Sequence, residues 1–408
     1  MNVANNTLRI WKEYVPDSWN IVPLKYAITY NNEKLSDQTD GKYEFDYVDI
    51  GSVTYGNGIE LYQHMKFEES PSRARRIVHT KDIIISTVRT YLKAIAQIEE
   101  HNNPIIVSTG FMTMRARDNI VLPDFLGYVA QSDGFVSEIE CQSYGTSYPS
   151  ITAGEIASLS IPLPPLSEQQ AIVHYLDTKC AAIDEVIEKH KKIIEKLEEE
   201  ERSIVFKTVT CGLDKDIDFK HSGIRWTPYI PKHWEARRLK YSVVVTNGSN
   251  PHTEGNIPVY GSGAKSFKTC GESKDPPTVL VGRKGATLHI PHYIDHPYWN
   301  VDTAFDTKPI NDTHMKWFYY VARCLDYKYY ITQTTLPSMT QTDYGNMIIP
   351  TPPIHEQSEI AEYLDTITIK LNNIKDSHKI IITKLEEYKK SIIYNAVTGK
   401  IDCREAIK

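Results

Sequence analysis

The chain repeats itself, and this repeat constrains its fold more than any other feature of the sequence. Residues 161–214 align without a gap with residues 349–402, and 24 of the 54 positions are identical, where chance would give about 3 for average composition. A second repeat opens each half, because the pattern from Trp11 to Tyr26 recurs from Trp226 to Tyr241. The period is far longer than that of a solenoid. The sequence therefore predicts an internal duplication with pseudo-two-fold symmetry.

The two repeats have different offsets, which shows where the halves diverge. The closing segments are 188 residues apart and the opening segments 215, so the first half has 27 more residues between them. The frame of each half repeats while its interior differs. A scaffold that carries two equivalent platforms with two different reading surfaces would have this pattern.

A long amphipathic run without proline or glycine follows each Ile-Pro-x-Pro-Pro segment and predicts a helix of about 44 residues, roughly 65 Å long. Apolar residues recur at steps of three and four in both runs: Ile172, Leu176, Ile183, Ile187, Ile194, Leu197 and Ile204, then Ile360, Leu364, Leu371, Ile374, Ile382, Leu385 and Ile392. Neither stripe can be buried by its own helix. Because the second helix returns the chain toward its start, we predict an antiparallel pair with a globular domain at each end.

Two histidines, His190 and His378, are repeat-equivalent and fall in the apolar register near the middle of each predicted helix. We expect them to approach each other across the pair. No third ligand is in sight, so we interpret them as packing or register residues and not as metal ligands.

The segments between the repeated parts have strand and turn character. Residues 47–53 lead into a Gly56-Asn57-Gly58 turn, residues 83–89 are typical of a buried strand, and residues 278–285 are a strand that runs into a basic turn. Long helical patterns are scarce there, which predicts an α+β fold for each domain. We divide the chain into a first globular domain (1–160), a first long helix (161–214), a second globular domain (215–348), and a second long helix with its tail (349–408).

Composition excludes several classes of protein. No apolar run approaches the roughly 18 residues needed to span a bilayer, and the N-terminus lacks the apolar stretch of a secretory signal, so we expect a cytoplasmic protein without a membrane partner. The six cysteines have no metal-ligand spacing, and we interpret them as free thiols. The net charge of −6 does not indicate a nucleic-acid binder, but residues 73–93 carry a local excess of basic side chains.

Catalytic motifs are missing from the sequence. The Gly282-Arg283-Lys284-Gly285 turn lacks the spacing of a nucleotide-binding loop. Asp275-Pro276-Pro277-Thr278 has threonine where the motif of amino-methyltransferases has an aromatic residue, and no glycine-rich cofactor loop accompanies it. We therefore predict no catalytic residue, no metal site and no cofactor bound by this chain, and a function in binding.

Direct readout of DNA requires basic, amide, hydroxyl and aromatic side chains on exposed loops, while phosphate contacts fix the register. Such residues occur in both divergent interiors. The candidate DNA-binding residues are Arg73, Arg75, Arg76, Arg89, Tyr91, Lys93, Tyr144 and Ser147 in the first half, and Asn247, Lys265, Lys268, Arg283, Lys284, Thr334 and Thr335 in the second.

The paired Ile-Pro-x-Pro-Pro-x-x-Glu-Gln segments (161–169 and 349–357), the Trp-x-x-Tyr-x-Pro-x-x-Trp openings and the two divergent interiors resemble the specificity subunits of type I restriction-modification enzymes. The Gly282–Gly285 turn is also similar to a segment of their recognition domains; the first half has Ser86-Thr87-Val88-Arg89 in a comparable place.

The resemblance covers nearly the whole chain and implies a DNA-recognition role. Each domain would read one part of a bipartite, asymmetric target in double-stranded DNA, and the helices would set the spacer and dock methyltransferase subunits, two of them. Restriction subunits would complete an ATP-dependent nuclease. S-adenosylmethionine, ATP and magnesium would be bound by those partners, and this chain would not be an enzyme by itself.

Other readings of the sequence stay open at this point. The chain could be a coiled-coil scaffold that binds protein without DNA specificity, or the recognition part of a single-chain restriction-methylation enzyme. An enzyme with an unrecognised site is a third alternative.

Overall fold

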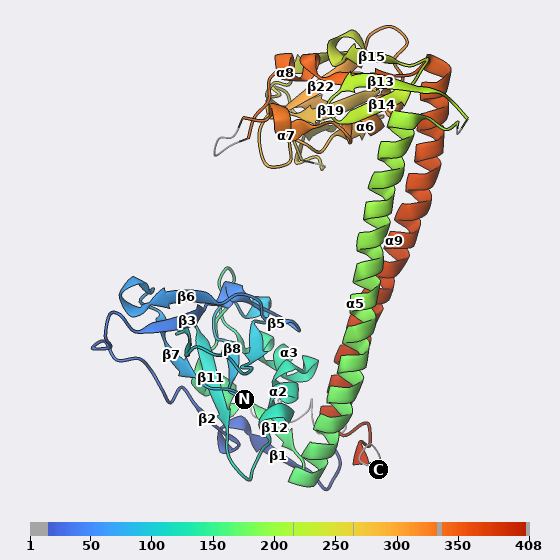
Figure 1. Ribbon diagram of the computed structural model, residues 1–408. Coiled ribbons are helices and arrows are strands. Elements are labelled where there is room, and N and C mark those ends of the chain that lie inside the picture. The colour runs from blue at the N-terminus through green and yellow to red at the C-terminus, as the bar shows by residue number, and fades with distance from the viewer. Residues whose placement is uncertain (1–14, 215, 264, 333–336, 405–408) are drawn as a thin grey trace. The chain divides into compact units, whose positions relative to one another are not determined.

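The computed structural model describes residues 15–214, 216–263, 265–332 and 337–404, and it divides into two compact units (Figure 1). Unit 1 comprises Met1–Lys189 and Ile380–Lys408, and unit 2 comprises His190–Lys379. Each unit therefore contains one domain and a segment of both long helices.

Unit 1 contains two four-stranded sheets. The first has the order β2-β11-β8-β9 and consists of β2 (Ile28–Tyr30), β11 (Phe111–Ala116), β8 (Ile83–Ser86) and β9 (Ile95–Gln97). The second has the order β6-β3-β10-β7 and consists of β6 (Gln63–Lys66), β3 (Glu44–Val48), β10 (Ile105–Ser108) and β7 (Ala74–Val78). The short strands β4 (Val53–Thr54) and β5 (Gly58–Ile59) form a hairpin at the predicted Gly56–Gly58 turn.

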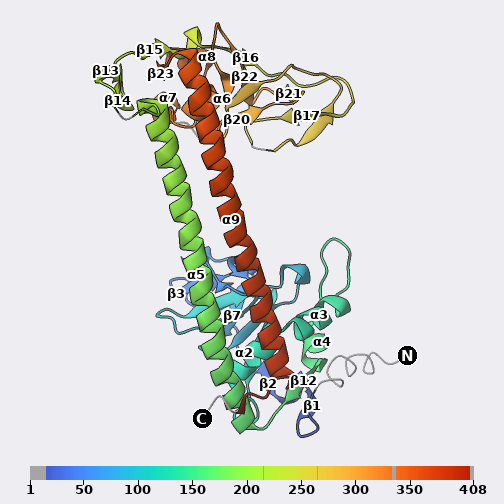
Figure 2. The same cartoon turned by 90° about the vertical axis from the view of Figure 1, so that its right-hand side faces the viewer.

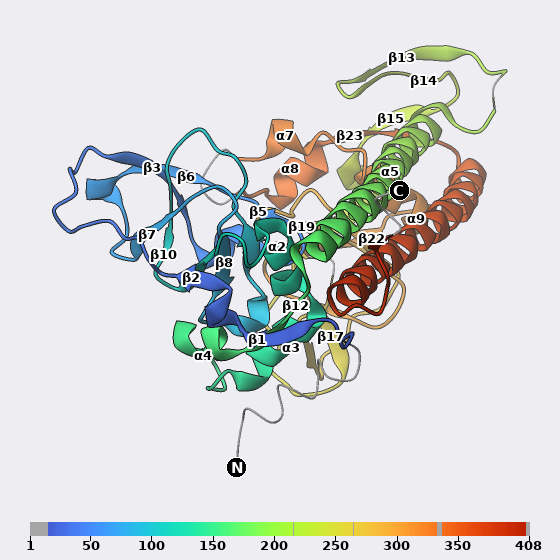
Figure 3. The same ribbon diagram turned by 90° about the horizontal axis from the view of Figure 1, so that it is seen from below.

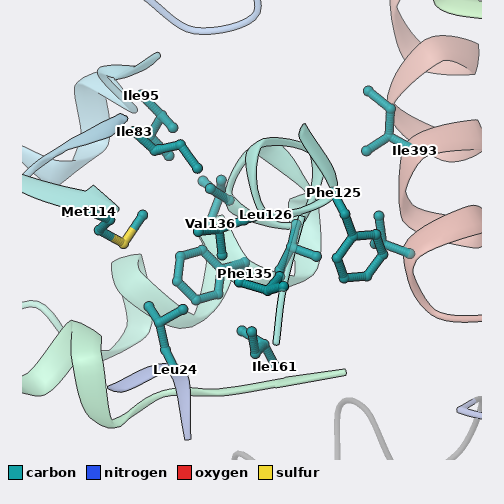
Figure 4. Packing of buried hydrophobic residues seen from close by; sticks show 14 of the residues in the cluster. Leu24, Ile83, Ile95, Met114, Phe125, Leu126, Phe135, Val136, Ile161 and Ile393 are labelled. Carbon is teal, nitrogen blue, oxygen red and sulfur yellow. The ribbon is translucent and has the colours of Figure 1, made fainter. Parts of the chain in front are cut away.

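In the described part of unit 1, three α-helices and a strand pair accompany the sheets. The helices are α2 (Pro123–Gln131), α3 (Asp133–Gln142) and α4 (Ala153–Ser158). Strand β1 (Asn20–Pro23) lies antiparallel to β12 (Ser160–Leu163), so the opening of the half meets the segment just before its long helix (Figure 3). Phe125 and Leu126 of α2 pack with Phe135 and Val136 of α3 in the main core, which Ile83 of β8 also joins (Figure 4).

Unit 2 repeats this arrangement with a smaller second sheet. Its first sheet has the order β16-β22-β19-β20, formed by β16 (Val243–Asn247), β22 (Ala304–Pro309), β19 (Thr278–Gly282) and β20 (His292–Ile294). A three-stranded sheet follows the order β18 (Lys268–Cys270), β17 (Ile257–Tyr260) and β21 (Trp299–Asn300). The other elements are the hairpin β13 (Phe219–Ile224) and β14 (Thr227–Pro231), the pair β15 (Glu235–Arg238) and β23 (Ile348–Thr351), and helices α6 (Met315–Ala322), α7 (Tyr327–Tyr330) and α8 (Gln341–Asn346).

The strand registers show that the two sheets correspond strand by strand. Ala116 pairs with Ile28 as Pro309 pairs with Val243, and Phe111 pairs with Ser86 as Ala304 pairs with Gly282. The offset between equivalent residues falls from 215 at β2 and β16 to 196 at β8 and β19. Most of the 27 extra residues therefore lie between β2 and β8, where unit 1 builds the larger second sheet. The predicted α+β class and the duplication are confirmed.

The long helices are α5 (Leu166–Cys211) and α9 (Ile354–Val397), and they lie side by side (Figure 2). Gly212 and Gly399 follow them with φ of 77° and 75°, the left-handed conformation that ends a helix. In unit 1, Ile172 to Ile187 of α5 share a core with Ile382 to Val397 of α9. In unit 2, Val205 and Val209 share a core with Ile360 and Leu364. The chain directions are opposite, which confirms the predicted antiparallel pairing.

The predicted apolar stripes are correct except at one position. Ile374 is 45% exposed, whereas its neighbour Lys375 is only 9% exposed. Hydrophobic periodicity assigned the inward position to isoleucine because a lysine is seldom buried without a partner. The partner is Glu201 of α5, whose carboxylate accepts a hydrogen bond from Lys375 Nζ at 2.8 Å.

The two helix histidines meet as predicted. Nδ1 of His190 and Nδ1 of His378 are 2.6 Å apart, and the rings are tilted with centroids 4.9 Å apart. In the described part of the chain, no group of three or more His, Cys, Asp or Glu side chains is placed to hold a metal ion. Among the same residues, no helix has the length and apolarity of a membrane span.

Candidate nucleic-acid interface

A tryptophan–glutamate hydrogen bond closes the frame of each half. Trp19 Nε1 donates to Glu168 Oε2 at 2.9 Å, and Trp234 Nε1 donates to Glu356 Oε2 at 2.8 Å. The tryptophans belong to the opening repeat and the glutamates to the closing repeat. This contact explains why both motifs recur at different offsets: within each half, the start of the domain is fastened to the start of its long helix.

The glutamine of each Glu-Gln pair fastens a second point of the domain to that helix start. Gln169 is fully buried; its Oε1 accepts a hydrogen bond from the Leu122 N–H, and its Nε2 donates to the carbonyls of Ile120 and Pro164. In unit 2, Gln357 Oε1 accepts from the His314 N–H and Nε2 donates to the Pro352 carbonyl. Leu122 and His314 are the residues before α2 and α6.

A tyrosine–aspartate pair repeats in the same way. Tyr128 of α2 donates to Asp177 of α5 at 2.7 Å, and Tyr320 of α6 donates to Asp365 of α9 at 2.6 Å. Burial and the adjacent carboxylate raise the pKa of both phenols, so both stay protonated donors. The frame thus holds the domain of each unit on its helix at three repeated points.

Within this frame, each unit brings a strand-end turn against a closing loop. We use these names for residues 86–89 with residues 144–151 in unit 1, and for residues 282–285 with residues 332 and 337–339 in unit 2. The Ile151 N–H donates to the Thr87 carbonyl, and the Met339 N–H donates to the Arg283 carbonyl. Two residues further along each turn, the Arg89 N–H donates to the Pro149 carbonyl and the Gly285 N–H donates to the Pro337 carbonyl.

These hydrogen bonds establish the equivalence of the two turns. The isolated bridges Val88 to Ser150 and Lys284 to Ser338 complete the correspondence. The Ser86-Thr87-Val88-Arg89 segment is therefore the counterpart of Gly282-Arg283-Lys284-Gly285, as their places in the sequence suggested. The backbone is shared while every side chain differs, which is the arrangement required of two readers with different targets.

Arg89 stands where the second turn has a glycine, and both residues have positive φ, 53° for Arg89 and 107° for Gly285. A side chain in this region costs about 1–2 kcal/mol relative to glycine. Arg89 is exposed, and its guanidinium lies 5.2 Å from the ring centre of Tyr148 in the closing loop. A strained, exposed cation held on an exposed aromatic ring indicates a role for the side chain beyond folding.

Most of the remaining candidates of unit 1 surround this turn. Tyr91, Tyr144 and Ser147 are exposed, with Tyr91 in the short helix after the turn and the other two in the closing loop. Lys93 also follows the turn, but Glu140 Oε2 lies 3.2 Å from its Nζ. Arg73 is exposed, and its carbonyl accepts a hydrogen bond from the Thr109 N–H. The next residue, Gly110, accepts a hydrogen bond from the Thr87 N–H of the turn, so Arg73 lies near the turn.

Arg75 and Arg76 lie instead on β7, in the other sheet. Arg75 lies over the Phe67 ring at 4.9 Å, and its Nε is 3.6 Å from Asp37. Arg76 is half-buried with no hydrogen-bond partner at Nε, and burial lowers the pKa of its guanidinium. The structure does not bring these two arginines into the turn and loop.

In unit 2, Arg283 and Lys284 form the turn itself. Arg283 Nη1 donates to the Asp302 carbonyl at 3.4 Å, and Lys284 Nζ is 4.0 Å from the Asp302 carboxylate. The Thr287 hydroxyl, two residues after the turn, donates to the Ser262 carbonyl, and Lys265 is exposed. Lys268 and Asn247 are exposed on β18 and at the end of β16. Thr334 and Thr335 lie outside the described residues.

Two residues join the candidates because of their placement alone. Tyr148 is 67% exposed and supports Arg89, and Thr287 follows the second turn. Their position in turn and loop segments was the available signal, but a tyrosine or threonine in such a segment has no motif that distinguishes it.

Comparison with known proteins identifies the family. The profile of the type I restriction modification DNA specificity domain matches residues 16–199 and 232–384, one region in each half. The chain therefore belongs to this family, and it is a specificity subunit of a type I restriction-modification system. The finding disfavours a scaffold that binds protein alone.

Individual relatives agree with this assignment. A protein of Methanocaldococcus jannaschii, provisionally named as the MjaX specificity subunit, is 24% identical over 95% of this chain and 94% of its own length. The MjaIX specificity subunit of the same organism is 24% identical over 74% of each chain. One solved structure concerns the complex assembly and conformational transition of the type I R-M system. A chain in it has the same fold as this protein, with a TM-score of 0.73 and 24% sequence identity. The match covers 95% of this chain and 99% of that one.

Proposed function

We propose that this chain reads a split DNA target through two unlike surfaces, each formed by the strand-end turn and closing loop of one unit. The observation that carries the proposal is that each turn makes the same backbone hydrogen bonds with its closing loop while the two turns carry different side chains. Base edges are distinguished by side chains, whereas a shared backbone fixes how those side chains are presented. One target with two different halves follows from this arrangement.

The proposal extends to the partners of the chain. We infer that α5 and α9 set the unspecified spacer between the two parts of the target and dock two methyltransferase subunits, to which restriction subunits are added. S-adenosylmethionine, ATP and magnesium are then bound by these partners, and the chain has no turnover of its own. The 46 and 44 residues of the two helices support the spacer role, because protein geometry fixes the distance between two linked readers.

Arg89→Gly tests the proposal with little risk to folding. Glycine relieves the positive φ, so we expect the melting temperature of the protein to stay the same or to rise. DNA binding by the complex with methyltransferase subunits should weaken by roughly fivefold or more, because a good base contact contributes about 1–3 kcal/mol. If Arg89 contacts a phosphate, the slope of log affinity against log salt should also fall by about 1.

Lys81→Gly is the matched control. Lys81 is another exposed basic residue with positive φ, 70°, and it lies before β8, at the end of that strand opposite the turn. Its ion pair with Asp124 is exposed and contributes little to stability. Unchanged affinity for Arg89→Gly, or an equal loss for both variants, would remove the turn of unit 1 from the DNA interface.

A further inference from the structure

The contact between the two long helices contains ion pairs of one polarity: the acidic residue lies on α5 and the basic residue on α9. In unit 1, Lys389 Nζ of α9 lies 2.7 Å from each carboxylate oxygen of Asp184 on α5. The lysine side chain is 24% exposed and the aspartate side chain 52%. Here the acid belongs to α5 and the base to α9.

Unit 2 contains a buried version of the same contact. Glu201 of α5 is 6% exposed; its Oε2 accepts from Lys375 Nζ of α9 at 2.8 Å, and its Oε1 accepts from Arg323 Nη2 at 2.7 Å. Burial alone would raise the pKa of Glu201, but the hydrogen bonds from Lys375 and Arg323 outweigh it and hold the pKa below the usual value. The carboxylate is therefore charged, and again the acid is on α5.

The repeat makes this direction unexpected, because α5 and α9 are copies of one ancestral helix. Residues 188 positions apart occupy equivalent places, so Lys389 is the counterpart of Glu201, and Lys375 is the counterpart of Ile187. The apolar residues of the contact are retained in both copies, with Ile172 matching Ile360 and Leu176 matching Leu364. Apolar packing alone would allow either helix to pair with a copy of itself from a second chain.

We propose that the ion pairs select the pairing of α5 with α9 and reject pairing between identical helices of two chains. In an α5–α5 pair built on the same contacts, Asp184 meets Glu201. In an α9–α9 pair, Lys375 meets Lys389. Two-fold symmetry would place each like-charge contact twice, and Glu201 would lose the lysine of its partner helix while facing Ile187.

The physical basis is the difference between paired and unpaired buried charge. A buried ion pair adds little net stability over an apolar contact, but removing one partner is strongly unfavourable because the other charge stays desolvated. Charged side chains flanking an apolar helix seam select partners in this way. The selection does not depend on the proposed DNA function, since it concerns only which helices associate.

Reversing the charges of one helix in the full-length chain tests the proposal. Lys375→Glu with Lys389→Glu makes the α9 contact acidic, and Asp184→Lys with Glu201→Lys makes the α5 contact basic. Each double variant should melt roughly 6–20 °C lower than the natural chain, from the cost of a broken buried pair. The quadruple variant should recover part of this loss, because Arg323 still lacks the carboxylate of residue 201, and should remain a monomer by light scattering.

Two further variants keep the test independent of the buried site. Asp184→Lys with Lys389→Asp exchanges only the partly exposed pair and should melt within a few degrees of the natural chain. Lys370→Glu with Lys384→Glu makes the same change of net charge at exposed positions of α9 and should leave melting and mass unchanged.

Mixing the two destabilised double variants gives the sharpest result. One has acidic contacts on both helices and the other basic contacts on both, so we expect them to form a 1:1 heterodimer while each alone does not self-associate. No heterodimer on mixing, or no recovery of melting temperature in both exchanged variants, would overturn the proposal.

Discussion

Gly282→Ala should remove most of the sequence-specific DNA binding of the complex and lower the melting temperature of the protein. A Cβ atom at residue 282 would lie 2.2 Å from the Cα and 2.7 Å from the carbonyl oxygen of Leu288. Both are backbone atoms, so the turn itself must move. The hydrogen bond from the Gly282 N–H to the Leu288 carbonyl is then lost, and Arg283 and Lys284 are displaced together.

The expected loss of affinity for the specific target is roughly 10–100-fold, from about 1–3 kcal/mol for each misplaced base contact. Gly263→Ala is the control, since a Cβ at that position meets nothing within 4 Å. Titration of the assembled complex with target and non-target duplexes measures both variants. If Gly282→Ala lowers the melting temperature but leaves the preference for the target intact, the second turn does not read DNA.

Gln169→Leu should destabilise unit 1 by about 3 kcal/mol, which corresponds to a fall in melting temperature of roughly 6–12 °C. Leucine has nearly the volume of glutamine but leaves the Leu122 N–H and the carbonyls of Ile120 and Pro164 without their partner. Each unsatisfied buried group costs about 1–3 kcal/mol. The loss is large because the side chain joins three backbone points at the start of α5.

The neighbouring residue provides a control with the same chemical change. Gln170 is exposed, so Gln170→Leu should alter stability by less than about 0.5 kcal/mol. Thermal melting combined with hydrogen exchange of the 120–131 amides distinguishes the two variants. Equal effects would show that the conserved place of Gln169 in the repeat is not explained by its hydrogen bonds.

The repeat predicted the frame of the molecule correctly because the frame depends on the residues that recur. Two offsets were enough to place the long helices, their antiparallel pairing and the meeting of His190 with His378. The same comparison could not show that Trp19 bonds Glu168 or that Gln169 anchors α2. The first contact joins residues 149 positions apart and the second joins residues 47 positions apart, and nothing in the local sequence specifies such a partner.

Hydrophobic periodicity could not predict which charged residues lie in the contact between α5 and α9. A scheme that assigns apolar residues to the interior selects Ile374 over Lys375, because it does not include the carboxylate of Glu201 on the other helix. Three of the four residues in the run Glu198–Glu201 are exposed, as is usual for a charged helix face. The fourth, Glu201, is buried by a partner that is only visible in three dimensions.

The structure brings together only part of the predicted set of DNA-binding residues. Arg89, Arg283 and Lys284 lie on equivalent turns, but Arg75 and Arg76, close to Arg73 in the sequence, lie on β7 in a different sheet. A cluster of basic residues along the chain does not become a cluster in space when a strand runs through it, since neighbouring side chains alternate between faces. The contribution of Thr334 and Thr335 stays a prediction.

Exchange of residues 23–150 for the corresponding segment of another specificity subunit tests the two-reader proposal most directly. The segment contains the strand-end turn of unit 1 and all but the last residue of its closing loop, while α5 and α9 stay unchanged. Methylome sequencing of cells that carry the chain with its partner subunits reads both parts of the target and the spacer. We predict that one half of the methylated motif changes, whereas the other half and the spacer length remain. A change in both halves, or an altered spacer, would contradict two independent reading surfaces on a shared frame.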